Sequence, residues 1–113
     1  MASAMSSEPA LDFLQAADRI LNEILQKLDA FDPDELEADL ASGVLKISFP
    51  DRRSCIINRQ SAASQIWLAE GASAWHFHRP PGTSSWTDTK GRGQLEVVLG
   101  DILSRRLGRT VQL

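Results

Sequence analysis

The sequence contains a single cysteine, Cys55, and no long hydrophobic run. One cysteine cannot build an internal disulfide framework, and this usage is typical of a reducing compartment. No apolar run approaches the roughly 20 residues that a membrane-spanning helix needs. Residues 1–7 are small and polar, without the basic and apolar regions of a signal peptide. We therefore expect a cytoplasmic protein with no membrane partner, in which Cys55 is a buried structural thiol.

Common catalytic and nucleotide-binding motifs are also absent. No glycine-rich phosphate loop follows a predicted strand, and no G-x-S-x-G motif supports a Ser/His/Asp set. The basic residues are scattered, and the strongest charged patch is negative, so it would repel phosphates. The sequence therefore predicts neither a catalyst nor a nucleic-acid-binding protein.

The charge is unevenly distributed along a chain of 113 residues, which is long enough for one domain with one core. Residues up to Ser42 carry ten acids and two bases, a net charge of −8. From Gly43 onward five acids meet ten bases, a net charge of +5. This asymmetry predicts a one-sided electrostatic surface. We expect a mobile tail over residues 1–7 and a single domain over residues 8–113.

The first predicted element is an amphipathic helix. Ser7 is a candidate N-cap, and apolar residues then recur at spacings of three and four from Leu11 to Leu28. This helix must end before Pro33, which disfavours helical geometry in the preceding residue.

The last predicted element is a second amphipathic helix. An apolar stripe runs from Leu95 to Leu107, and Gly108 is well placed to end it. Asp88 or Thr89 is the candidate N-cap.

Short β-patterned segments lie between the two helices. The predicted strands are Leu36–Leu40, Val44–Phe49, Ser54–Gln60, Gln65–Ala69, Ala74–His78 and an edge strand at Trp86–Asp88. Consecutive strands with short turns imply an antiparallel sheet. Two helices with one apolar stripe each can cover only one sheet face, so the other face stays wet. The predicted fold is α+β, a two-layer sandwich with two helices on one face of an antiparallel sheet of five to six short strands.

The central hairpin places a tryptophan on the predicted outer face. Because side chains alternate along a strand, Ile66 and Leu68 point into the core and Trp67 points outward. An exposed indole is unusual unless something covers it, and nearby amides can bond both donors and acceptors of a partner. The predicted partner-binding set, which we name the docking surface, is Asn58, Gln60, Gln65 and Trp67. The alternative is that polar neighbours half-cover Trp67, which then has no binding role.

Six acids and no base occupy the segment from Asp29 to Asp39. We name them the acidic ridge: Asp29, Asp32, Asp34, Glu35, Glu37 and Asp39. Acids at the C-terminal end of a helix are disfavoured by ~0.3–1 kcal/mol. Carboxylates are hard ligands suited to Ca²⁺, Mg²⁺, Mn²⁺ or iron, and without EF-hand spacing they predict several shallow, weak, partly hydrated metal sites. The alternatives are a solvated acidic surface or a patch that meets a basic protein.

The H-x-H pair His76 and His78 supplies possible additional metal ligands. If the segment is a strand, both imidazoles lie on one face. The alternative is one internally satisfied histidine and one surface histidine.

Three runs in the central part of the chain are I-N-R-Q at 57–60, Q-I-W-L-A at 65–69 and W-H-F at 75–77. Together they resemble the central signature of the frataxin family, whose bacterial members are called CyaY. The order of elements and the acids after the first helix also match, so the resemblance covers about residues 11–107. One departure is His78, where the bacterial pattern often has Asp. Another is Leu25-Gln26-Lys27, where family members often carry further acids.

This resemblance implies the same two-layer sandwich and a role in iron–sulfur cluster assembly. It also implies weak binding of Fe²⁺ or Fe³⁺ at the acidic ridge and protein contacts through the docking surface. The implied partners are a cysteine desulfurase and the cluster scaffold protein, and without iron the implied state is a monomer.

Three hypotheses follow for the function. The first is an iron-binding regulator of cluster assembly without an active site, in which iron and partner compete for the ridge. The second is an enzyme, a ferroxidase with iron storage at the ridge. The third is a metal-independent protein–protein adaptor.

Overall fold

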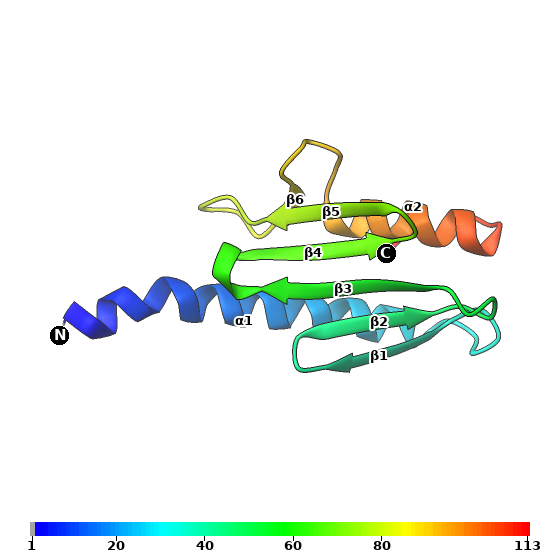
Figure 1. The fold of residues 1–113 in the computed structure, drawn as a ribbon, viewed down its shortest axis with the longest axis horizontal. Helices are drawn as coiled ribbons and strands as arrows, with labels where there is room; N and C mark the ends of the chain where they lie inside the picture. Colours follow the sequence, from blue (N-terminus) through cyan, green and yellow to red (C-terminus); the bar gives the residue numbers. More distant parts are fainter. Residues whose placement is uncertain (1) are drawn as a thin grey trace.

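The computed structural model describes the backbone of residues 2–113 and the side chains of residues 11–113. In chain order the elements are α1 (Ala2–Leu28), β1 (Glu37–Ala41), β2 (Val44–Ser48), β3 (Ser54–Gln60), the 3-10 helix η1 (Ser61–Ala63), β4 (Gln65–Glu70), β5 (Ser73–His78), β6 (Thr87–Asp88) and α2 (Leu95–Leu107) (Figure 1). In this part of the chain, no helix combines the length and apolar character needed to cross a membrane.

The six strands form one antiparallel sheet whose spatial order follows the chain, β1-β2-β3-β4-β5-β6. Both helices lie behind the same face of this sheet, and the other face is left uncovered (Figure 1). This arrangement confirms the predicted two-layer sandwich. We call the face toward the helices the inner face and the opposite one the outer face.

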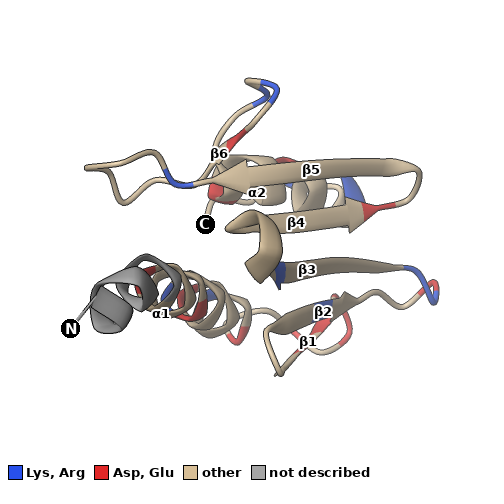
Figure 2. Ribbon diagram, turned by 60° about the vertical axis from the view of Figure 1, so that its left-hand side comes forward, with Lys and Arg blue, Asp and Glu red and all other residues tan. Residues whose placement is uncertain are grey.

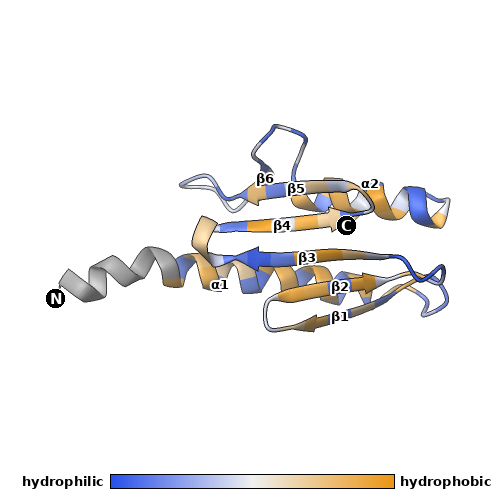
Figure 3. Cartoon of the chain, in the orientation of Figure 1, coloured by the Kyte–Doolittle hydropathy of each residue, from blue (hydrophilic) through white to orange (hydrophobic). Residues whose placement is uncertain are grey.

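The core lies between the helices and the inner face. Leu45, Ile57 and Leu68 are register partners across β2, β3 and β4, and all three are buried. The stripes of both helices complete this core with Phe13, Ala17, Ile20, Leu21, Ile24, Leu28, Leu95, Val98, Leu99, Ile102 and Leu103. Figure 3 shows hydrophobic and hydrophilic residues interspersed along both helices, as expected for elements with one buried side.

The cysteine lies in the same core. Cys55 is fully buried in β3. Burial raises the pKa of its thiol to about 12, with a further upward contribution from Glu70. The predicted burial of Cys55 is confirmed, and a thiol that stays protonated is a poor nucleophile.

Neither helix has the N-cap residue that was predicted for it. α1 begins at Ala2, so Ser7 lies within the helix instead of capping it. The preceding residues include alanines and a methionine, which favour helix. The mobile tail expected over residues 1–7 concerns residues whose side chains are outside the described part, and it stays a prediction.

α2 starts later than its predicted caps allow. Its N-cap is Gln94, which makes no side-chain capping bond, while Asp88 belongs to β6 and is buried. Asp88 instead pairs with Phe77 of β5, and its carboxylate accepts a hydrogen bond from the Arg92 N–H in the following loop. The predicted stop is confirmed, since Gly108 has φ 67° and its N–H donates to Ser104 O.

Candidate functional site

The docking surface lies on the uncovered outer face, on the adjacent strands β3 and β4, and His76 of β5 lies beside it. Asn58 on β3 is the register partner of Trp67 on β4, and Trp67 is the register partner of His76 on β5. Gln60 and Gln65 form the next outward-facing pair at the hairpin end. The predicted alternation is confirmed, because Ile66 and Leu68 are buried while Trp67 is half-buried on the opposite face.

Trp67 is partly covered by its own neighbours. Its Nε1–H donates to Gln65 Oε1 at 2.7 Å. Its ring stacks on the His76 imidazole, with ring centroids 4.2 Å apart and planes 11° apart. The indole therefore needs no hydrogen-bond acceptor from a partner, and it offers its remaining exposed ring area instead. The half-covering that we considered as an alternative is present, and it fixes the orientation of the ring.

The surroundings of Trp67 are uncharged. On β3, β4 and β5, the described outward-facing side chains include amides, alanines, histidines and Ile56, but no Lys, Arg, Asp or Glu. Val44, which pairs with Asn58 on the neighbouring strand, is 41% exposed. This part of the sheet can bind a partner through apolar and amide contacts, because it requires no charged group to be desolvated.

The acidic ridge runs from the end of α1 along the edge strand β1. Asp29 directly follows α1, and Asp32 and Asp34 lie in the turn before β1. Glu37 and Asp39 are exposed on the same face of β1, whereas Glu35 precedes the strand. Figure 2 shows acidic residues at the end of α1 and on β1, on the side of the sheet away from β5 and β6.

One ridge carboxylate is neutralised by an arginine. Glu35 accepts two hydrogen bonds from Arg109, Nε to Oε2 at 3.0 Å and Nη2 to Oε1 at 3.1 Å. The ion pairs among the described side chains involve none of the other five ridge acids. The ridge therefore keeps a concentrated negative charge at one edge of the sheet.

The ridge carboxylates do not form a preformed metal cage. Within residues 11–113, no group of three or more His, Cys, Asp or Glu side chains is arranged to hold a metal ion in common. Exposed carboxylates of this kind can bind hard cations singly or in pairs, with water completing the shell. The shallow, hydrated metal sites inferred from the sequence stay a prediction.

The histidine pair lies far from the ridge. His76 and His78 share the outer face of β5, with His76 half-buried against Trp67 and His78 exposed. Because β5 is the fifth strand of the sheet and β1 the first, the separation is roughly 19 Å at 4.8 Å per strand. The histidines therefore cannot join the ridge acids in one site, and any role as ligands would be a separate one.

The sequence did not reveal the ion pairs that hold the two layers together. On the inner face, Arg59 Nη1 pairs with Asp18 Oδ1 of α1 at 2.6 Å. The Arg59 side chain passes close to Gly43, because a Cβ added at Gly43 would lie only 2.6 Å from Arg59 Nε. Arg59 belongs to the I-N-R-Q run, but it faces α1 and not the docking surface. The alternation of side chains along β3 places Asn58 on the outer face and Arg59 on the inner face, and it was the only sequence signal that distinguished the two residues.

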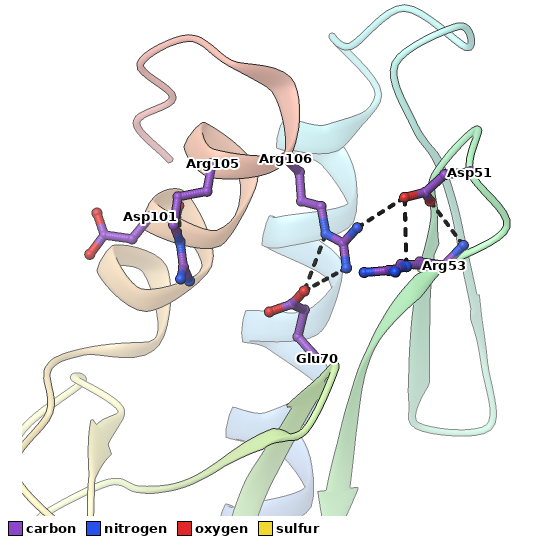
Figure 4. A network of polar contacts seen from close by, with 6 residues as sticks. All are labelled: Asp51, Arg53, Glu70, Asp101, Arg105 and Arg106. Carbon is purple, nitrogen blue, oxygen red and sulfur yellow. Dashed lines mark hydrogen bonds and ion pairs between the residues drawn. The ribbon is translucent and has the colours of Figure 1, made fainter.

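A second such contact closes the opposite end of the sandwich. Arg106, in the last turn of α2, pairs with Glu70 at 2.6 Å and with Asp51 at 3.2 Å (Figure 4). Its guanidinium also lies over the Phe49 ring, 5.0 Å from the centroid. The partners are 36 and 55 residues away in sequence, so no local pattern could predict them.

The chain is similar in sequence to a known family of protein domains. Residues 6–109 match the model of the frataxin-like domain. The iron–sulfur cluster assembly protein CyaY of Dechloromonas aromatica is 39% identical over 103 residues, covering 90% of this chain and 95% of that protein.

Two solved structures share the fold. The frataxin of Psychromonas ingrahamii has a TM-score of 0.81 at 23% identity, covering 91% of this chain and 95% of that one. A trimeric frataxin from the yeast Saccharomyces cerevisiae, complexed with ferrous iron, has a TM-score of 0.64 at 24% identity, covering 90% and 88%.

Proposed function

This chain belongs to the frataxin-like family, and from that membership we propose that it acts in iron–sulfur cluster assembly. Its relatives named for this role match it over nearly their whole length. We propose more narrowly that it binds iron weakly and regulates or assists the complex of a cysteine desulfurase with the cluster scaffold protein.

One observation carries this proposal. The outer face combines an uncharged region around Trp67 with a strand edge that bears unpaired carboxylates. Two surfaces of different chemistry on one rigid sheet suit a protein that contacts two components of an assembly at once. The ridge fits a basic protein surface, and the docking surface fits an uncharged one.

Iron is bound as cargo in this proposal. Ridge acids that are exposed and unpaired, such as Asp32, Asp34 and Glu37, present hard oxygen ligands to Fe²⁺ or Fe³⁺ and to other divalent cations. Weak binding is expected because separate side chains on a helix end, a turn and a strand cannot surround an ion. A ferrous complex of the yeast frataxin supports iron as the cargo. Since the same carboxylates would meet a basic partner, iron and partner binding should weaken each other.

Two binding measurements on the purified chain test the proposal. Replacing Trp67 with Ala should weaken binding to the desulfurase–scaffold complex at least tenfold, a size typical of an aromatic anchor, and leave iron binding unchanged. A triple variant, with Asp32 and Asp34 replaced by Asn and Glu37 by Gln, should bind iron more weakly. Its binding to the partner should also depend less on salt. Both variants binding like the wild type would contradict the proposal.

We propose a binding protein, not an enzyme. A ferroxidase at the ridge would consume dioxygen with turnover, whereas a binding protein takes up Fe²⁺ only in a fixed ratio. Dioxygen consumption measured over a large excess of Fe²⁺ distinguishes the two. A metal-independent adaptor would show no Fe²⁺-dependent rise in melting temperature, which preferential binding to the folded state requires.

A further inference from the structure

Strand β5 extends beyond its short neighbour β6. β6 contains only Thr87 and Asp88, which pair with His78 and Phe77. The portion of β5 from Ser73 to His76 therefore has no strand beside it on that side. Such an edge presents backbone N–H and C=O groups that need other partners.

The end of β6 and the loop after it supply those partners, and we call Asp88, Thr89 and Arg92 the β5 clasp. Asp88 Oδ1 accepts a hydrogen bond from the His76 N–H at 3.3 Å. The Thr89 N–H donates to His76 O at 2.8 Å, and Arg92 Nη2 donates to Ala74 O at 2.9 Å. The clasp thus continues the sheet with two side chains and one backbone group in place of a strand.

The clasp is itself held rigidly. The Asp88 carboxylate is shielded from solvent and accepts backbone hydrogen bonds from Lys90 and Arg92. Arg92 binds it with two nitrogens, Nε at 2.7 Å and Nη2 at 3.1 Å. The Arg92 guanidinium also lies over the Trp75 ring, 5.4 Å from the centroid. A buried carboxylate with this many donors has one strongly preferred arrangement.

The outer face depends on the same backbone. Both backbone groups of His76 are directed to the clasp, so His76 and Trp67 form a pair without hydrogen bonds between their backbones. Pairs of this kind have their side chains closer together than hydrogen-bonded pairs. The stack of the His76 ring on Trp67 at 4.2 Å therefore requires that the His76 backbone keep its place.

We propose that Asp88 and Arg92 are positioning residues of the docking surface, because they fix β5 at Ala74–His76 and so hold His76 in its stack on Trp67. This inference rests on the proposed function of that surface. It assigns a role in partner binding to Asp88 of β6 and to Arg92 of the following loop, neither of which is part of the surface.

The experiment compares Asp88→Ala with Glu70→Ala in the full chain. Glu70→Ala is the matched control, because it removes the carboxylate of another well-shielded arginine pair, at the end of β4 that leads into the β4–β5 turn (Figure 4). NMR reports the stack directly, since the indole ring shields the stacked imidazole protons of His76. Amide hydrogen exchange at His76 reports the loss of its acceptor. Titration calorimetry with the desulfurase–scaffold complex reports affinity.

We expect Asp88→Ala to abolish the shielding and to speed exchange at His76. Its affinity should fall by roughly two- to tenfold, the effect of having to immobilise one side chain on binding. Glu70→Ala should retain the shielding and the wild-type affinity. If Asp88→Ala does not fold, Arg92→Met serves in its place, because it removes the bond to Ala74 O and the ion pair while keeping an apolar stem over Trp75.

Shielding that persists in the clasp variant overturns the inference, and so does an affinity loss of equal size in Glu70→Ala. Lost shielding with unchanged affinity also overturns it when Trp67→Ala binds weakly in the same assay. Wild-type affinity of Trp67→Ala contradicts the proposed function itself and the docking role of the clasp with it. In that case the NMR comparison still decides whether the clasp positions His76.

Discussion

Replacing Asp88 with Asn should destabilise the protein in a way that depends on pH. Hydrogen bonds from the Arg92 side chain are the main cause that lowers the pKa of the Asp88 carboxyl to about 2. An unfolded aspartate has a pKa of about 3.9. With 1.36 kcal/mol for each pKa unit, the ionised carboxylate contributes on the order of 2 kcal/mol to the free energy of unfolding at pH 7.

The sign of the pH dependence follows from the lowered pKa. A carboxyl whose pKa is lower in the folded state contributes its full stability above its unfolded pKa and loses it as pH falls through its folded pKa. The wild type should therefore exceed Asp88→Asn by about 2 kcal/mol from pH 7 down to about pH 5, and the difference should shrink between about pH 4 and pH 2. Asparagine is nearly isosteric with aspartate, so packing is preserved in the comparison.

Urea unfolding of both proteins at a series of pH values measures this difference. The exposed acids titrate in both proteins and cancel in the comparison. A difference that stays constant from pH 7 to pH 2 would show that packing, and not the ionised carboxylate, makes Asp88 important. A difference below about 0.5 kcal/mol at pH 7 would mean that the Arg92 pair behaves like an exposed surface pair.

Two further predictions concern the core. Leu68→Ala should lower the free energy of unfolding by about 2–5 kcal/mol, measured by urea denaturation, because Leu68 is buried at the centre of the sheet; a loss below 1 kcal/mol would contradict the predicted packing of β4. Cys55 should not react with a thiol reagent at pH 8 in the native protein and should react after denaturation, because it is buried and its thiol pKa is about 12. Rapid labelling of the native chain would contradict that burial.

Most of the fold could be predicted because it follows from local periodicity. The alternation of Ile66, Trp67 and Leu68 on β4 placed the inner face correctly. Gly108 marked the end of α2 because helices commonly end in a left-handed residue, which glycine adopts without strain.

The contacts between distant segments could not be predicted. Asp88 looked like a helix cap, because an acid shortly before an apolar stripe is a common capping signal. Its actual partners come from β5 and from the following loop. Backbone groups at the edge of β5 need hydrogen-bond partners, and this is evident only once the sheet is assembled. The same holds for Arg106, which joins turns that are distant in sequence.

The candidate site was predicted in composition and orientation but not in detail. Alternation on β4 placed Trp67 on the outer face, and the density of acids identified the ridge. Neither pattern indicated that His76 covers one face of the indole or that Arg109 neutralises Glu35. Such pairs depend on strand register and on tertiary packing, which sequence spacing alone does not specify.

Amide NMR during an anaerobic Fe²⁺ titration, followed by addition of the cysteine desulfurase, tests most directly whether the ridge binds both. We expect Fe²⁺ to perturb residues 29–39 first and the desulfurase to displace it from them. Perturbations confined to other parts of the chain, or iron and desulfurase bound together without mutual effect, would contradict a shared site at the ridge.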